Sequence, residues 1–399
     1  MNKFSFLIFL LSFLNSLNSN AINGIPCTYS LDGRVLFIYE HYNLEGKTLS
    51  MPENSTICFR GGRISNGAIV GNNTSITGIT RSIFDNVEIK GTWNVKSIST
   101  RMFVSTEKEN SLKQVFALTN ETVNNEVYIA PGSYILNAKQ NKQILTVKSN
   151  TKVTIDGAIN LVPNDYTWYN MFYVSGDNIT IKGKGLVCGD KQNHMGKDGQ
   201  WGMGVAIYNG HNILMSGITI KDCWGDCIYI GQNSTDITIK KCNLISGRRQ
   251  GISITSAKNV LIEKSTIQDV SGCDPQFAID LEPNKNDTVD NITIKKVKSI
   301  DCYGVFKIAG REPGAYVGEV TIINSSISGA SARYPLELIR ANTVLIKKNK
   351  ITLLDKQVNL VEEISDFTAE SNTVSSDLDT PYRVITTKSK EIHDKKVRR

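Results

Sequence analysis

Two acidic side chains in the segment FAIDLEP are the strongest candidates for chemistry in this 399-residue chain. Asp280 and Glu282 are separated by one residue in a stretch where polar and apolar residues alternate, as they do in a β-strand. On a strand they would project to the same side, about 6.6 Å apart. The acid and base of an inverting glycosidase lie roughly 6.5–9.5 Å apart. The pair therefore favours acid–base chemistry on a glycosidic bond.

Further polar residues join this pair when the repeats described below are aligned. One outward column is predicted to contain, turn by turn, Tyr229, Ser253, Asp280, Lys307 and Glu337. The candidate catalytic residues are Asp226, Asp280, Glu282 and Lys307. The candidate substrate-binding residues are Arg248, Arg249, Gln250, Tyr229, Trp201, Arg311 and Glu337, and Asp274 is expected at the edge of the patch.

The patch has several chemical interpretations. Close carboxylates separate their pKa values, so one stays protonated and serves as the acid of a hydrolase. Lys307 or an arginine beside them would instead suit the base of a β-eliminating lyase. Carboxylates alone could hold Ca²⁺, but no CxxC or similar ligand pattern predicts a metal or other cofactor.

A structural interpretation competes with these. Asp280, Lys307 and Glu337 on successive turns would also form an ion-pair ladder, which at a surface contributes little stability. We expect Asp280 and Glu282 to be exposed in either case, because Ile279 and Leu281 are the residues that pack inward.

Aromatic residues mark a second feature near residue 200. The interval from Asn178 to Asn212 is ten residues longer than the regular repeat. The inserted loop and the turn before it contain Tyr166, Trp168, Tyr169, Asp190, His194, Asp198 and Trp201. Such an insertion often walls a binding groove, although the aromatics could equally cover a small core of the loop. No partner for His194 is evident from the sequence.

A repeat of 23 to 32 residues predicts the fold that positions these residues. Successive units start at Asn212, Asp236, Asn259, Asn291, Glu319, Thr343 and Asp366. Each unit contains short strands of alternating pattern separated by Gly, Asn or Ser, with no room for helices. This is typical of a β-solenoid. The sequence thus predicts an all-β chain, a right-handed parallel β-helix over residues 104–387.

The remaining segments are assigned around this body. Residues 110–118 have a short amphipathic helix pattern and are expected to cap the open end of the solenoid. Residues 22–103, rich in Gly, Asn and Ser, are expected to form a small β-rich unit beside the cap. Residues 388–399 are expected to be a solvated basic tail.

The helix and the following VYIAPGSYIL resemble the start of the pectate-lyase superfamily of β-helices. Residues 145 to 285 are similar to the polygalacturonase family of glycoside hydrolases, whose turns contain Gly-Asp-Asp-Cys-Ile-Ala-Ile, Gly-His-Gly-Ile-Ser-Ile and Arg-Ile-Lys. The corresponding segments are WGDCIYIG, RRQGISITS and FAIDLEP. The resemblance implies a carbohydrate-active β-helix. The chain also resembles secreted bacterial β-helix proteins of undefined activity.

The chemical residues depart from that family's pattern. Asp226 matches the second Asp of its Asp-Asp pair, but Gly225 stands in the first place and Gln250 in that of the His. Met203 replaces a further acid of the preceding turn. Asp280 and Glu282 replace the Arg and Lys that hold a uronate carboxylate, so a polyanion is not the expected substrate.

Charge and cysteine content limit the other classes. The formal net charge is +7, but the last 12 residues carry +4 and Lys3 one more, which leaves +2 and no basic field for nucleic acid. Eight cysteines permit disulfides in an exported chain, with Cys27 and Cys58 a plausible pair. We therefore expect a polysaccharide partner. The function expected is glycoside hydrolase, with a polysaccharide lyase or epimerase, or a non-catalytic glycan-binding surface protein, as alternatives.

The N-terminus predicts export. An apolar run over residues 4–14 is too short to span a bilayer, and Ser19-Asn20-Ala21 supplies small residues for signal peptidase. Residues 1–21 are thus a predicted signal peptide, with no stable membrane span, and the mature chain would be secreted, periplasmic or surface-attached. N-terminal sequencing of the exported form should begin near Ile22; a sequence starting at Met1 would contradict this.

Overall fold

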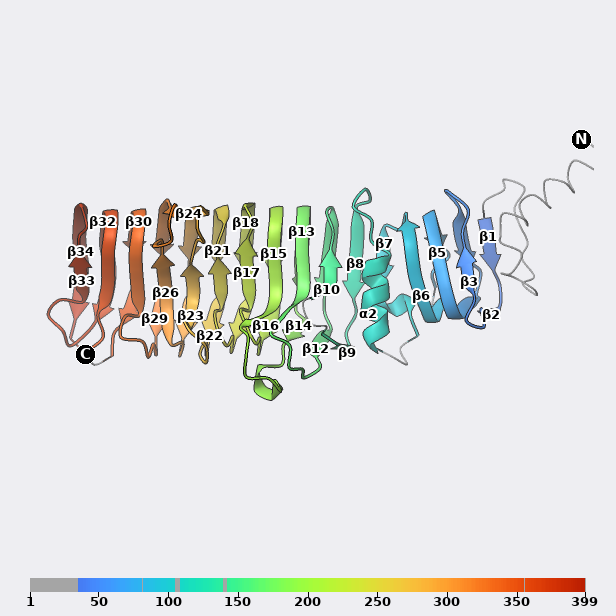
Figure 1. The fold of residues 1–399 in the computed structure, drawn as a ribbon, viewed down its shortest axis with the longest axis horizontal. Helices are drawn as coiled ribbons and strands as arrows, with labels where there is room; N and C mark the ends of the chain where they lie inside the picture. Colours follow the sequence, from blue (N-terminus) through green and yellow to red (C-terminus); the bar gives the residue numbers. More distant parts are fainter. Residues whose placement is uncertain (1–34, 81, 105–107, 139–141, 355, 399) are drawn as a thin grey trace, which may run out of the picture. The chain divides into compact units, whose positions relative to one another are not determined.

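The computed structural model describes residues 35–398 apart from positions 81, 105–107, 139–141 and 355. The predicted signal peptide and Cys27 lie outside the described residues. The chain divides into two compact units, residues 1–130 with 150–154, and residues 131–149 with 155–399. Almost all regular structure is parallel β-strand, drawn as stacked arrows in Figure 1. No helix among the described residues is long and apolar enough to cross a membrane.

The first unit contains a six-stranded parallel sheet formed by β1 to β6, followed by further short elements. Its elements are β1 (Val35–Ile38), β2 (His41–Asn43), β3 (Thr48–Ser50), β4 (Thr56–Phe59), β5 (Arg63–Thr77), β6 (Phe84–Trp93), β7 (Ser97–Ser99), the 3₁₀ turn η1 (Thr100–Met102), α2 (Lys108–Ala117), β8 (Asn125–Ile129) and most of β11 (Thr151–Ile155). The expectation of a small β-rich segment at the N-terminus is confirmed, and Cys58 is buried in β4.

The predicted helix is present as α2. Its expected apolar face is buried, with Leu112, Val115, Phe116 and Leu118 at most 5% exposed. Within the first unit the helix contacts β6 and η1 before it and β8 after it. It therefore belongs to the N-terminal unit, and the observed division between the two units falls after the expected boundary at residue 103.

The second unit is a parallel β-solenoid. Its elements are β9 (Ser133–Leu136), β10 (Lys142–Val147), β12 (Ala158–Leu161), β13 (Trp168–Gly183), β14 (Leu186–Cys188), the 3₁₀ turn η2 (Lys191–Asn193), β15 (Trp201–Ser216), β16 (Thr219–Lys221), β17 (Ile228–Gly231), β18 (Ser234–Lys240), β19 (Asn243–Ile245), β20 (Ile252–Ile254), β21 (Ala257–Glu263), β22 (Thr266–Gln268), β23 (Phe277–Leu281), β24 (Thr288–Lys295), β25 (Lys298–Ile300), β26 (Gly304–Ala309), β27 (Tyr316–Val317), β28 (Glu319–Ile323), β29 (Ser326–Ser328), β30 (Leu336–Lys347), β31 (Lys350–Thr352), β32 (Asn359–Ser375), β33 (Tyr382–Ile385) and β34 (Ser389–Val397).

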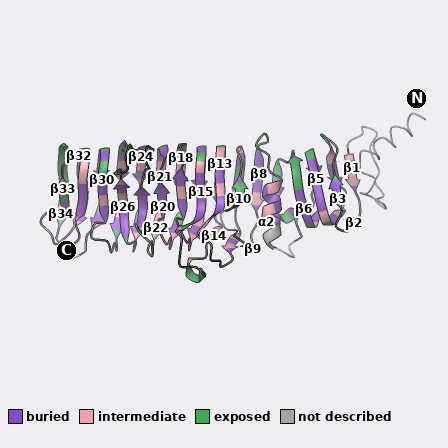
Figure 2. Cartoon of the chain, viewed as in Figure 1, coloured by how far each residue is buried: buried purple, intermediate pink, exposed green. Residues whose placement is uncertain are grey.

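The register confirms the predicted repeat. β15, β18, β21, β24, β28, β30 and β32 pair in sequence, and the predicted repeat starts align from turn to turn. Their inward residues form one apolar column at most 1% exposed, made of Ile213, Ile237, Val260, Ile292, Val320, Val344 and Phe367. In Figure 2, buried residues recur along β18, β21 and β24 between intermediate and exposed ones. Apolar stacking along the axis is therefore the main source of packing in this unit.

The basic tail predicted at residues 388–399 is instead largely a strand. Residues Ser389–Val397 form β34, which pairs in parallel with β32. Most of its side chains are exposed, so main-chain hydrogen bonds hold the segment on the last turn. The sequence did not predict this strand, because its residues are mostly polar. A strand at the edge of a stack buries little of its own surface and so needs few apolar residues.

Buried asparagines close one corner of the last turns. Asn372 donates to the carbonyl of Ile346 at 2.9 Å and accepts from the backbone N–H of Asn349 at 2.8 Å. Asn349 donates in the same way to the carbonyl of Ile322. Each amide thus satisfies backbone groups that the bend of the chain leaves without a strand partner.

Removing one of these amides should destabilise the solenoid. We expect Asn372→Ala to lower the free energy of unfolding by about 3 kcal/mol, since it leaves several buried polar groups unpaired. The exposed Asn342→Ala should change it by less than about 0.5 kcal/mol. Urea unfolding of both variants measures the difference, and equal effects would contradict a structural role for the buried ladder.

Candidate functional site

The predicted outward column is present on one sheet of the second unit. Tyr229 pairs with Ser253, Ser253 with Asp280, Asp280 with Lys307 and Lys307 with Glu337. Neighbouring parallel strands lie about 4.8 Å apart, so these side chains succeed one another along the solenoid axis. The repeat alignment therefore places four site candidates and Ser253 correctly relative to one another.

The expectation that Asp280 is exposed is wrong. Asp280 and its neighbour Ser253 are both 0% exposed. These short side chains lie between the longer Tyr229 and Lys307 on the adjacent turns, and Gln250 reaches over to donate from Nε2 to Asp280 Oδ2 at 2.6 Å. Outward orientation from a strand does not ensure exposure when larger neighbours close over the position.

Arg249 connects two of the predicted carboxylates. Its Nη1 lies 3.4 Å from Asp226 Oδ2, and its Nη2 donates to Glu282 Oε2 at 2.6 Å. The Asp226 side chain is fully buried, Arg249 is 11% exposed and Glu282 is 36% exposed. The three groups thus run from the interior to the solvent, with the guanidinium in the middle.

Burial shifts the proton affinity of the two inner acids. Burial raises the pKa of Asp226 to about 7, an effect that the Arg249 charge opposes and Glu282 reinforces. Burial and then Glu282 hold the pKa of Asp280 well above its usual range, although Lys307 and Arg249 oppose this. Burial disfavours charged Arg249, but Asp226 and Glu282 more than compensate and raise its pKa.

The hydrogen bonds indicate which oxygen of Asp280 can carry a proton. Gln250 Oε1 accepts the backbone N–H of Phe277 at 2.7 Å, which orients the amide so that Nε2 faces Asp280 Oδ2. Asp280 Oδ1 is buried and has no hydrogen-bond partner within the described residues, and the same holds for Asp226 Oδ1. Protonated forms of both acids would therefore present their O–H from Oδ1.

The other predicted residues divide between this cluster and separate contacts. Lys307 Nζ lies 3.3 Å from Glu337 and 5.3 Å from the centre of the Phe277 ring, so it is engaged beside the cluster. The structure does not bring Arg311 to the cluster, because its guanidinium binds Glu362 at 2.7 Å. The Asp274 carboxylate accepts from Gln276 within its own turn.

Arg248 faces the inserted loop and not the carboxylates. Its guanidinium lies 3.6 Å from the centre of the Trp224 ring, and Nη1 donates to the carbonyl of Gly199 at 2.8 Å. Trp201, the first residue of β15 after this loop, is 46% exposed. Arg248, which the sequence predicts to bind substrate, therefore binds the loop of residues 189–200 instead.

The structure adds residues that the sequence did not assign. His194 Nδ1 lies 2.8 Å from Asp190 Oδ2, and Asp190 Oδ1 accepts the hydroxyl of Tyr169 at 2.6 Å. Tyr208 lies between Tyr173 and Tyr229, with ring centroids 5.5 and 5.1 Å away. The four-residue spacing of Asp190 and His194 was a usable signal. The tyrosine row was not, because Tyr208 lies two residues beyond the repeat position that Tyr173 and Tyr229 share.

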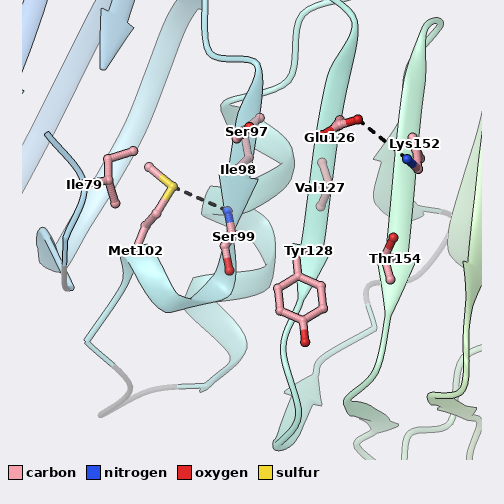
Figure 3. Close-up of a pocket in the computed structure, with 10 residues that line it drawn as sticks. All are labelled: Ile79, Ser97, Ile98, Ser99, Met102, Glu126, Val127, Tyr128, Lys152 and Thr154. Carbon is pink, nitrogen blue, oxygen red and sulfur yellow. Dashed lines mark hydrogen bonds and ion pairs between the residues drawn. The ribbon is translucent and has the colours of Figure 1, made fainter. Parts of the chain in front are cut away.

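No three His, Cys, Asp or Glu side chains within the described residues are arranged as ligands of a metal ion. A pocket in the first unit is separate from all predicted site residues. It lies over β7, β8 and β11, where Glu126 and Lys152 form a 3.6 Å ion pair beside Tyr128 (Figure 3).

Comparisons with known proteins agree with the fold. Residues 141–294 match the family model for the right-handed β-helix region. The SPbeta prophage-derived uncharacterized protein YorA of Bacillus subtilis is 28% identical over 188 residues, 39% of this chain and 32% of that protein. The uncharacterized protein YclG of the same organism is 27% identical over 194 residues, 41% of this chain and 33% of its own. The matches thus span about a third of each relative.

Solved β-helix structures are similar at low identity. The family 28 exopolygalacturonase of Yersinia enterocolitica has 11% identity and a TM-score of 0.43, over 76% of this chain and 79% of that enzyme. The tailspike of Escherichia coli bacteriophage HK620, solved with a pentasaccharide, has 14% and 0.47, over 71% and 63%. The mannuronan C-5 epimerase AlgE4 A-module of Azotobacter vinelandii has 11% and 0.46, over 73% and 94%.

The raised pKa of Asp226 makes stability depend on pH. The folded state binds this proton more tightly than the unfolded chain, so the stabilisation is complete below about pH 4 and is lost as the pH rises through about 7. Asp226→Asn cannot ionise. It should match the wild type near pH 4 and exceed it above about pH 7, by on the order of 4 kcal/mol.

Urea unfolding of Asp226→Asn at several pH values measures this change. Asp177→Asn, at an exposed position, serves as the control and should follow the wild type throughout. A difference between Asp226→Asn and wild type that stays constant from acid to alkaline pH would contradict a buried, protonatable Asp226.

Proposed function

We propose that this protein hydrolyses glycosidic bonds in a polysaccharide outside the cell. The observation that carries the proposal is the arrangement around Arg249, which joins a buried acid of raised pKa, Asp226, to an accessible carboxylate, Glu282. Glycosidases need one protonated and one ionised carboxyl group on opposite sides of the scissile bond. Desolvation raises the pKa of Asp226 in the direction that a general acid requires, and Glu282 is accessible to solvent.

The spacing of the two groups is compatible with such a pair. Because a single guanidinium contacts both carboxyl groups, their nearest oxygens cannot be more than about 8 Å apart, inside the upper limit of the roughly 6.5–9.5 Å used by inverting enzymes. In the proposed mechanism Asp226 donates a proton to the leaving oxygen, and Glu282 activates water. Asp280, held by Gln250, adds a second buried acid of raised pKa to the same cluster.

Arg249 controls access in this proposal. Its guanidinium stands between Glu282 and the fully buried Asp226. A sugar that hydrogen-bonds Glu282 competes with Nη2, and a shift of Arg249 away from Glu282 opens the way to Asp226. Without substrate, Arg249 thus shields Asp226 from water, and this burial also maintains the raised pKa of Asp226.

The charge of the cluster bears on the substrate. Three carboxyl groups face Arg249, and Lys307 is paired with Glu337. Arg249 is engaged by Glu282 and Lys307 by Glu337, so among the described residues of the cluster neither cation is free to balance the charge of a uronate. We therefore propose an uncharged sugar at the cleavage site, and unesterified polygalacturonate should not be hydrolysed.

A second candidate function is glycan binding without hydrolysis. The complete burial of Asp226 and Asp280 favours it, because a buried ion-pair cluster can hold strands together without meeting substrate. The lyase alternative is less favoured. Its candidate base, Lys307, is already engaged by Glu337 at 3.3 Å.

An activity screen with two readouts separates these candidates. The protein without residues 1–21 is incubated with starch, β-glucan, xylan, mannan, galactan and unesterified polygalacturonate. New reducing ends without ultraviolet absorbance indicate hydrolysis, absorbance of a new double bond indicates a lyase, and retention on a glycan without either product indicates a binder.

Variants then test the residues on the substrate that is cleaved. Glu282→Gln and Asp226→Asn should each lower kcat/KM by about 10²–10⁴, the usual contribution of a general acid or base. The exposed Glu319→Gln is the matched control and should keep full activity. Hydrolysis that survives in both cluster variants would place the active site elsewhere.

A further inference from the structure

Residues 189–200 form a loop that is fixed in place by a buried carboxylate. Asp190 Oδ2 accepts from the backbone N–H and the amide of Asn164, at 3.1 and 2.8 Å, and faces His194 Nδ1 at 2.8 Å. Oδ1 accepts the hydroxyl of Tyr169 at 2.6 Å. The side chains of Asp190 and His194 are both fully buried. One carboxylate thus ties the start of the loop to the turn beneath it.

A second anchor holds the far end of the loop. The His194 ring stacks on Trp224 with centroids 3.8 Å apart and planes 16° from parallel. Arg248 lies 3.6 Å from the same Trp224 ring and binds the carbonyl of Gly199. Trp224 Nε1 donates to the carbonyl of Asp198 at 3.4 Å. These contacts hold the loop at both ends. Trp224, which is 7% exposed, is the aromatic residue on which the loop packs.

Trp201 does not belong to that core. It follows the anchored loop directly, remains 46% exposed, and pairs in register with Trp168 on the neighbouring strand. An indole that stays exposed does not contribute the favourable free energy that its burial would give to the folded protein. The packing of the loop does not require Trp201, because Trp224 already provides it. Two adjacent indoles held on rigid backbone instead suit a ligand with a flat apolar face.

Trp201 lies on a strand that contacts the carboxylate cluster. It begins β15 and precedes Met203 by two residues, about 6.6 Å along the strand. The Met203 sulfur accepts the backbone N–H of Asp226 at 3.3 Å. A polymer that runs from the cluster along the start of β15 would therefore reach Trp201.

We propose that Trp201 and Trp168 form a sugar-stacking subsite for an uncharged pyranose of the polymer, and that Asp190 is the positioning residue that holds this subsite in place. The proposal rests on the proposed function for its polymer ligand. The two rings offer apolar faces and no charge, so the bound sugar is recognised through its C–H face. The subsite lengthens the binding surface and favours polymers over short oligosaccharides.

The test uses affinity electrophoresis of the full mature chain in gels that contain starch, β-glucan, xylan, mannan or galactan. Every variant is made in a Glu282→Gln background, so that hydrolysis does not alter the gel. Trp201→Ala should weaken binding to the retarding polysaccharide about tenfold, and Trp201→Phe should keep most of it, because a ring remains. Tyr316→Ala, which removes an aromatic that is 48% exposed on β27, is the matched control and should bind as the parent does.

The positioning role of Asp190 is tested by a double-mutant cycle. Asp190→Asn should weaken binding about as much as Trp201→Ala, and the two changes together should cost no more than either alone, because both act through one ring. With Glu282 intact, Asp190→Asn should raise KM on the polymer about tenfold and leave kcat within twofold. Additive losses, or a fall in kcat alone, would overturn the role of Asp190.

The outcomes also separate this proposal from the proposed function. Retardation that depends on Trp201 without any hydrolysis by the active chain would support the subsite and overturn only the hydrolase. Hydrolysis with unchanged binding in Trp201→Ala would overturn only the subsite. A wild-type chain that no polysaccharide retards would overturn both.

Discussion

The parallel pairing of each strand with the strand one turn later is the constraint on which the rest of the second unit depends. It fixes the spacing of side chains along the axis at about 4.8 Å and keeps each position of the repeat in one column. The inward columns become continuous apolar stacks, such as the one through Ile237 and Val260. In the outward columns, residues more than twenty positions apart in the sequence become neighbours in space, as Asp280 and Lys307 are.

This constraint explains how a costly cluster can persist. Buried carboxylates lose hydration, and a protein usually responds by neutralising them or pairing them. Here both responses occur together, since burial raises the pKa of Asp226 while Arg249 keeps part of its charge balanced. The rigid pairing of β20 with β23 prevents the chain from relaxing to expose Asp280. The stability needed to hold the cluster comes from the apolar stack beneath it.

The sequence predicted the parts of the structure that follow from the period. Alternation and repeat length were enough to place Tyr229, Ser253 and Asp280 in one column, because register in a stack allows no other arrangement. The helix face with Leu112 and Phe116 was predictable for the same reason, as a pattern of period 3.6. These features depend on residues that are related by a fixed spacing.

The features that the sequence did not predict depend on side-chain length and on irregular segments. The burial of Asp280 is set by the reach of Gln250 and by the larger residues on adjacent turns, which the period does not encode. Arg248 and Arg249 are neighbours in the chain, yet one binds the loop at Gly199 and the other the carboxylates. Their different partners follow from the turn geometry, where successive side chains diverge.

The departure from the polygalacturonase pattern gains a physical meaning from this arrangement. In an outward column, one substitution changes the charge that a ligand meets without changing the strand that presents it. Asp280 and Glu282 occupy places where the resemblance would put cations, and Arg249, on the preceding turn, then becomes the cation that faces them. The cation of this cluster thus lies one turn before the acids, while β20 and β23 pair in register and the inward Ile252 and Ile279 pack as in an ordinary solenoid rung. In such a scaffold the inward residues provide the packing and the outward residues meet the ligand, so the outward residues can vary without changing the fold. The chemistry of this chain therefore follows from its outward side chains and not from its fold.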